Sequence, residues 1–220
     1  MHSQDEVAFR LAWGLSHVPT RGPKPQYTID DIAQAGVAVA DASGLEGLSL
    51  ANVAKAVGLT TTALYRYVSS KDTLIELIAD AAAGPAPELT GATWQERVSA
   101  WAAARAAQIR LHPWLANVHP TSMPRLPHAI AWIDALLSAV ADEPTIHGLR
   151  LALLVDTVVT TYTRNALSTM TATALPDWLN EAIASGHPHL GHAMTVQTDE
   201  DELRAAIAII LRGISPQAPI

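Results

Sequence analysis

The sequence predicts an all-α protein, and three observations carry that prediction. Helix starts recur as a threonine followed three residues later by an acidic residue, at Thr28 with Asp31 and at Thr93 with Glu96, which is the capping-box pattern. Glycine and proline separate stretches whose apolar residues recur at helical spacing. No stretch alternates apolar and polar residues at the period of a strand, and no internal repeat is present.

The signals for helix starts and stops place the elements in order. Residues 4–16 have weak helical character, and the prolines and basic residues of 21–25 predict an extended basic arm. Gly44 and Gly58 are expected to end the next two helices, and residues 187–192 are expected to be a loop. Helices are expected at about 28–40, 50–57, 61–68, 71–82, 93–111, 127–141, 144–170, 176–185 and 199–213, with a short segment at about 114–118.

This order of elements predicts three parts. Residues 1–27 form an N-terminal extension with the basic arm. Residues 28–83 form an N-terminal three-helix head with a helix-turn-helix, since two short capped helices meet at a tight glycine turn. Residues 88–214 form a larger helical body. We refer to the second and third parts as the head and the body.

The charge is unevenly distributed along the chain. The formal net charge is −7 overall, but residues 21–71 carry five Lys or Arg against four Asp or Glu, and residues 72–220 carry eight against fifteen. An acidic body is repelled by phosphates, so it leaves the head as the part that meets DNA. The absence of cysteine, of a signal peptide and of a membrane-length apolar segment predicts a cytoplasmic protein without a membrane partner.

The head contains a specific motif. Residues 48–59 read LSLANVAKAVGL and residues 60–74 read TTTALYRYVSSKDTL. Together, at this spacing, they make residues 28–80 resemble the N-terminal domain of TetR-type repressors. The resemblance implies an operator-binding helix-turn-helix, a helical body that binds a small molecule, and a homodimer joined by the last two long helices.

The helix expected at 61–68 has two different sides. Leu64 and Val68 suit the core, whereas Thr61, Thr62, Tyr65 and Arg66 share the opposite side. A major groove admits such a helix, and Tyr65, Tyr67 and Lys71 resemble the family's phosphate contacts. The residues expected to contact double-stranded DNA are Ser49, Thr60, Thr61, Thr62, Tyr65, Arg66, Tyr67 and Lys71. The alternative is a small helical domain with an exposed aromatic helix. The basic arm either enters the minor groove or is idle.

Two helices of the body are suited to pairing between subunits. The helix expected at 144–170 is apolar nearly all round, so it needs cover on several sides. The last helix carries an apolar stripe, and its expected dimer-interface residues are Leu203, Ala206, Ile207, Ile210 and Leu211. The alternative is that both helices fill the core of a monomer.

The body also holds candidate effector contacts. Trp101, Arg105 and Gln108 fall on one side of a long helix, and tryptophans with a few polar groups suit an aromatic or amphipathic effector. The expected ligand-binding residues are Trp101, Arg105, Gln108, Trp114, Trp132, Asp156, Tyr162 and Trp178. The alternative is ordinary core packing.

Other chemistries find little support in the sequence. His187, His189 and His192 lie close together but without Cys or carboxylate partners, so no metal is expected. Enzyme motifs and a cofactor fingerprint are lacking. We therefore expect a ligand-released repressor rather than an enzyme. The alternatives are a regulator whose ligand promotes DNA binding, and a helical enzyme or carrier with a head of this shape.

Overall fold

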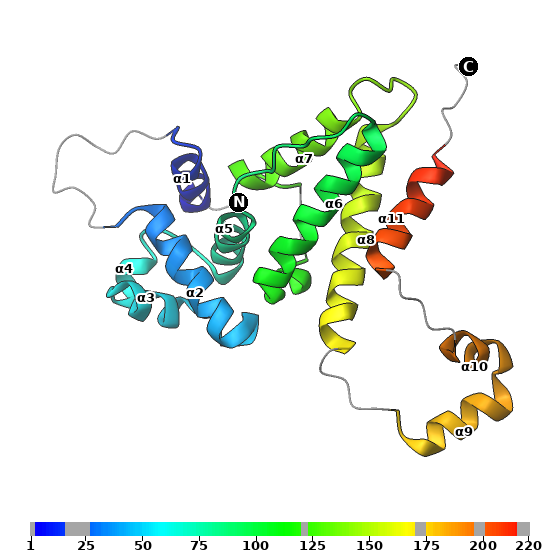
Figure 1. The fold of residues 1–220 in the computed structure, drawn as a ribbon. Coiled ribbons are helices and arrows are strands. Elements are labelled where there is room, and N and C mark those ends of the chain that lie inside the picture. The colour runs from blue at the N-terminus through cyan, green and yellow to red at the C-terminus, as the bar shows by residue number, and fades with distance from the viewer. Residues whose placement is uncertain (1–2, 16–26, 120–122, 170–174, 196–200, 215–220) are drawn as a thin grey trace.

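The computed structural model describes residues 3–15, 27–119, 123–169, 175–195 and 201–214 (Figure 1). All regular structure in these ranges is helical, which confirms the all-α prediction. The basic arm at 21–25 lies outside the described residues. The helices are α1 (Ser3–Ala12), α2 (Ile29–Gly47), α3 (Leu50–Val57), α4 (Thr61–Leu64), α5 (Lys71–Ala83), α6 (Trp94–Leu111), the 3₁₀ helix η1 (Pro113–Asn117), α7 (Pro127–Ala139), α8 (Gly148–Thr169), α9 (Asp177–Gly186), α10 (Pro188–Thr195) and α11 (Glu202–Gly213).

The expected capping boxes form at both places. The backbone N–H of Asp31 donates to the Thr28 hydroxyl over 3.1 Å, and the carboxylate of Asp31 accepts from the Thr28 backbone N–H over 2.7 Å. The Thr28 backbone N–H and hydroxyl hold the pKa of Asp31 below its ordinary value, because both bonds favour the carboxylate. Thr93 and Glu96 make the same reciprocal bonds at the start of α6. Local sequence therefore fixes the start of both long helices.

Three elements differ from the sequence prediction. Gly44 breaks the geometry of α2 with a φ of 66°, but a further turn continues to Gly47. Helix α4 ends at Leu64 rather than Val68, because the N–H groups of Arg66 and Tyr67 bond three residues back, to Ala63 and Leu64 over 3.1 and 2.9 Å. Residues 188–195, expected to be mostly loop, form α10 with Pro188 at its first position, where proline is well suited to a helix.

The head and the body are packed against one another. Helix α2 packs against α3 and α5 in the head, and α8 packs against α6, α7, α11 and η1 in the body (Figure 1). Helix α5 packs on α7, and η1 packs on α2. Helices α9 and α10 pack on each other (Figure 1). Helix α5 also packs on α6, so α2 and α5 both connect the head to the body.

Candidate nucleic-acid interface and body pocket

The helix-turn-helix is formed by α3, a glycine turn and α4. Gly58 has a φ of 82° and ends α3, and the N–H of Leu59 donates to the carbonyl of Ala54 over 2.8 Å. A side chain at that φ is strained, so glycine suits this turn. Leu64 and Val68 are fully buried in the core of the head. Their burial fixes which side of α4 faces outward.

The expected base-reading side of α4 is exposed. Thr61, Thr62 and Arg66 are exposed, and Tyr65 exposes 47% of its surface. An aromatic residue of this size left open on a rigid turn is available to a partner. All four side chains are therefore exposed, Thr61 and Thr62 on α4 and Tyr65 and Arg66 in the turn that follows it.

The other expected DNA contacts also have structural roles. The hydroxyls of Ser49 and Thr60 cap α3 and α4, accepting from the backbone N–H groups of Asn52 and Ala63 over 3.1 and 3.2 Å. Tyr67 is half-buried against the core. The ammonium group of exposed Lys71 donates to the carbonyl of Leu45 over 3.3 Å. Lys71 thus lies at the start of α5 beside the end of α2.

Helix α1, to which the sequence assigned no role, packs against the head and the loop before α7. Asp5 is buried and accepts from the hydroxyls of Ser69 and Thr73, the latter over 2.7 Å, at the start of α5. Phe9 is also buried, and the Arg125 guanidinium lies 4.7 Å from its ring centroid. The contacts of α1 therefore reach both the head and the loop before α7.

Two contacts join α2 of the head to η1 of the body. The indole N–H of Trp114 donates to Oδ1 of Asp41 over 2.7 Å, and Nδ1 of His112 lies 2.8 Å from the same oxygen. Trp114 is buried, so its N–H depends on this partner. A displacement of η1 would therefore also displace α2.

A second junction connects α5 to α7. Both carboxylate oxygens of Glu76 accept from the guanidinium of Arg125, over 2.7 and 2.9 Å. Asp80 is buried, and its carboxylate accepts from the backbone N–H of Ala129 over 2.7 Å and lies 3.3 Å from Nδ1 of His128. Burial raises the pKa of Asp80, and the Ala129 and His128 contacts oppose that rise.

A pocket of about 340 Å³ opens in the body between α6, η1 and α8. Two expected ligand contacts, Arg105 and Asp156, meet there, with Arg105 Nε 3.1 Å from Asp156 Oδ1. The other lining residues, which sequence reasoning missed, are Leu115, Ala116, Val118, His119, Thr157, Thr160, Thr161 and Arg164. The spacing of Asp156, Thr160 and Arg164, each one helical turn apart, was the available signal.

The expected tryptophan contacts lie in the core rather than on the lining. Trp101 and Trp132 are buried and form an edge-to-face pair with centroids 5.6 Å apart. The Trp101 indole N–H donates to the Trp132 carbonyl over 2.8 Å, and the Trp132 N–H donates to the Gly84 carbonyl over 3.0 Å. The Arg105 guanidinium lies 5.9 Å from the Trp132 ring centroid. These rings therefore support the pocket from behind Arg105.

Four further residues of the expected effector set are not on the pocket lining. Trp114 bonds to the head, Gln108 is half-buried on α6, and Tyr162 is exposed on α8. Trp178 lies on α9 and exposes 69% of its surface. A tryptophan count cannot distinguish core, junction and surface positions, which depend on tertiary packing.

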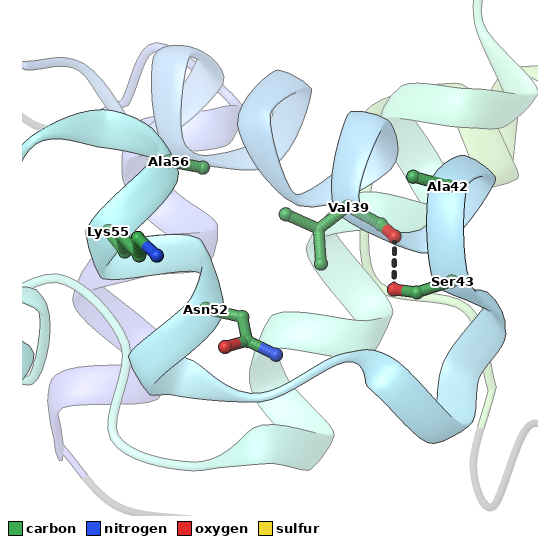
Figure 2. Close-up of a pocket in the computed structure, with 6 residues that line it drawn as sticks. All are labelled: Val39, Ala42, Ser43, Asn52, Lys55 and Ala56. Carbon is green, nitrogen blue, oxygen red and sulfur yellow. Dashed lines mark hydrogen bonds between the residues drawn. The ribbon is translucent and has the colours of Figure 1, made fainter.

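A second hollow lies on the head between α2 and α3, and Figure 2 shows it. It has a volume of about 430 Å³ and small apolar side chains such as Val39, Ala42 and Ala56 along it. The side-chain amide of Asn52 also lines this hollow and donates to the carbonyl of Gly47 over 2.7 Å. The charged residue on the lining is Lys55. The body pocket offers more groups that recognise a ligand, although it is smaller.

The expected dimer-interface residues face the protein's own body. Leu203, Ala206, Ile207 and Leu211 are buried where α11 packs on α8 and α6, and Ile210 is partly buried. On α8, by contrast, Leu149, Leu153 and Leu154 are exposed, and so is Ile209 on α11. These apolar side chains are available to a second copy.

The described residues contain neither a metal-binding cluster nor a membrane-spanning helix. In the described ranges, no group of three His, Cys, Asp or Glu residues could hold a metal ion, and His187 and His189 are exposed at α10. Within the same ranges, no helix combines the length and apolar character needed to cross a membrane.

Residues 28–78 match the family described as "Bacterial regulatory proteins, tetR family". The chain is similar to the HTH-type transcriptional repressor DrrR1 of Streptomyces coeruleorubidus, with 37% identity over 133 residues, which are 59% of this chain and 49% of that protein. It is also similar to an HTH-type transcriptional regulator of Saccharopolyspora erythraea, with 32% identity over 120 residues, 54% of this chain and 51% of that protein. The chain thus spans about half the length of these relatives.

The fold is similar to that of a solved TetR family protein. The structure of Streptomyces coelicolor ActR in complex with actinorhodin matches with a TM-score of 0.73 and 22% identity, covering 86% of this chain and 97% of that chain. This match extends from the head through the body. Residues 28–78 of this chain therefore match the tetR family model, and 86% of the chain shares the fold of the solved ActR structure.

Proposed function

We propose that this chain is a cytoplasmic transcriptional repressor that binds operator DNA as a homodimer and is released by a small molecule bound in the body pocket. The observation that carries the proposal is the exposed surface of Thr61, Thr62, Tyr65 and Arg66, held outward by the buried Leu64. Hydroxyls on a short helix and a guanidinium in the turn that follows it suit the donor and acceptor pattern of the major groove. The TetR-family match of the head supports the same reading.

A homodimer supplies the second head. One helix-turn-helix binds weakly, and a two-fold axis places two of them at the spacing of successive major grooves. The exposed Leu149, Leu153 and Leu154 of α8 supply an apolar surface for this contact, with Ile209 of α11. The residues of α11 that the sequence suggested are better assigned to the support of α8 from within each subunit.

Release follows from the position of η1. Leu115 and Ala116 line the body pocket, and the preceding Trp114 bonds to Asp41 of α2. A ligand that moves η1 therefore changes the orientation of α2, and with it the spacing of the two heads. Coupling of this kind amounts to about 1–3 kcal/mol in allosteric proteins. The similar protein DrrR1 is named a repressor, and the similar structure of ActR contains bound actinorhodin.

A mobility-shift assay tests the proposal with DNA from upstream of the chain's own coding region and a scrambled fragment of equal length. We expect tight binding to the first fragment and weaker, salt-sensitive binding to the second. Equal binding to both fragments, or none to either, would contradict operator recognition and leave the helical enzyme or carrier. Adding candidate effectors separates release from ligand-promoted binding.

A further inference from the structure

The charges of the body pocket are not balanced. Arg105 is already paired with Asp156 at 3.1 Å. Arg164 lines the same pocket, and its guanidinium has no hydrogen-bond or ion-pair partner in the part of the chain that the structure describes. A partly buried guanidinium without a partner favours an anion that supplies the missing acceptors.

Arg164 lies at a distance from Asp156 along α8. Asp156 and Arg164 are eight residues apart on one side of the helix, which corresponds to about 12 Å of axial rise. Asp156 is therefore too far along the helix to neutralise Arg164 while it also holds Arg105. The pocket has one end where charge is balanced and one end with an excess positive charge.

Between those ends the lining offers hydroxyls and an apolar wall. Thr160 and Thr161 line the pocket, and neither hydroxyl has a partner among the described residues. Leu115 and Val118 supply apolar surface opposite them from η1 and the residue that follows it. This combination suits a flat apolar molecule that carries hydroxyl or carbonyl groups along one edge.

We infer that the effector of this protein is an organic acid: an aromatic or polycyclic compound whose single carboxylate pairs with Arg164 and whose oxygen substituents bond to the threonines. The inference rests on the proposed function, because it assigns the ligand class of the same pocket. Arg164 then determines specificity, by preferring an acid over a neutral molecule of equal shape.

Calorimetry with salicylate and salicylamide tests this assignment in the absence of DNA. The two probes share a ring and a hydroxyl and differ in the charged group. We expect the unaltered protein to bind salicylate at least about tenfold more tightly than salicylamide, since a charge-assisted bond is worth more than a neutral one. Equal affinities, or no saturable binding of salicylate, would overturn the inference.

Variants locate the effect. Arg164→Gln should weaken salicylate binding roughly tenfold and leave salicylamide unchanged. Arg150→Gln removes the same charge from an exposed position of α8 outside the pocket lining and should leave both affinities unchanged. Equal losses of both probes in Arg164→Gln would reduce Arg164 to a packing role. A mobility-shift assay on the same samples distinguishes the two proposals. If the protein fails to bind operator DNA but still prefers salicylate to salicylamide, the repressor function is rejected and the acid-binding site is retained.

Discussion

The buried indole N–H of Trp114 donates to Oδ1 of Asp41 over 2.7 Å, which ties the body to helix α2 of the head. Trp114 directly precedes Leu115, which lines the body pocket. The bond therefore connects the proposed ligand pocket to the proposed DNA-binding domain.

Trp114→Phe should lower the free energy of unfolding by about 1–3 kcal/mol, because the variant keeps the ring but removes a donor to a carboxylate. Urea-induced unfolding followed by circular dichroism measures the change. Trp178→Phe is the matched control, since that side chain is 69% exposed and its replacement should cost little. Equal losses in the two variants would mean that the Asp41 bond contributes nothing to stability.

Lys71→Ala should reduce the salt dependence of DNA binding by about one in the slope of log affinity against log salt per subunit. The ammonium of Lys71 is exposed at the start of α5, near the expected phosphate path. Anisotropy titrations over a range of salt concentrations give the slope, on operator and random DNA alike. Lys55→Ala serves as the control from α3, and an unchanged slope for Lys71→Ala would remove Lys71 from the phosphate contacts.

Leu153→Asp should convert the dimer to a folded monomer, because the side chain is 72% exposed in one subunit and a carboxylate in an apolar interface is costly. Ile207→Asp is a poorer test, since Ile207 is buried within its own subunit and the change should unfold α11. Sedimentation velocity measures the oligomeric state. Leu111→Asp alters an exposed leucine of α6 and should stay dimeric; a dimeric Leu153→Asp would move the interface elsewhere.

Asp80 should give stability a distinct pH dependence. Burial raises its pKa in the folded protein above its ordinary value of 3.8, so the folded state binds the proton more readily than the unfolded chain between those two values. The contribution of Asp80 to stability therefore falls as pH rises through that window and is greatest below it. Urea unfolding gives the free energy of unfolding of the unaltered protein and of Asp80→Asn. The stability of the unaltered protein relative to the variant should increase as pH drops from about 7 to about 4. A difference that is flat, or that changes in the opposite direction, would show that Asp80 is not destabilised by burial.

The parts of the fold that sequence predicted well depend on neighbouring residues. The caps at Thr28, Ser49 and Thr60 form as expected, because each needs only a hydroxyl and an N–H three residues on. The exposed side of α4 followed from helical spacing and the burial of Leu64. In α10, Pro188 is a helix-start signal that the nearby histidines obscured.

The parts that sequence missed depend on residues far apart in the chain. Arg105 and Asp156 were expected to serve the pocket and do meet there, but Trp101 turned into the core, where its N–H bonds to the carbonyl of Trp132. The apolar stripe of α11 was visible, yet which partner covers it depended on the packing of α8. Local periodicity predicts which face of a helix is apolar, but the tertiary structure determines which element packs against that face.

Competition binding with the Arg66→Ala variant tests the central claim most directly. Arg66 is exposed on the proposed reading surface, and loss of a base contact should cost about 1–3 kcal/mol on the operator, or roughly 5- to 150-fold in Kd, and much less on scrambled DNA. Arg110→Ala removes the same charge from an exposed position of α6 and should leave both affinities near those of the unaltered protein. A loss confined to the operator is the predicted result; equal losses on operator and scrambled DNA, or none on either, would contradict sequence reading by this surface.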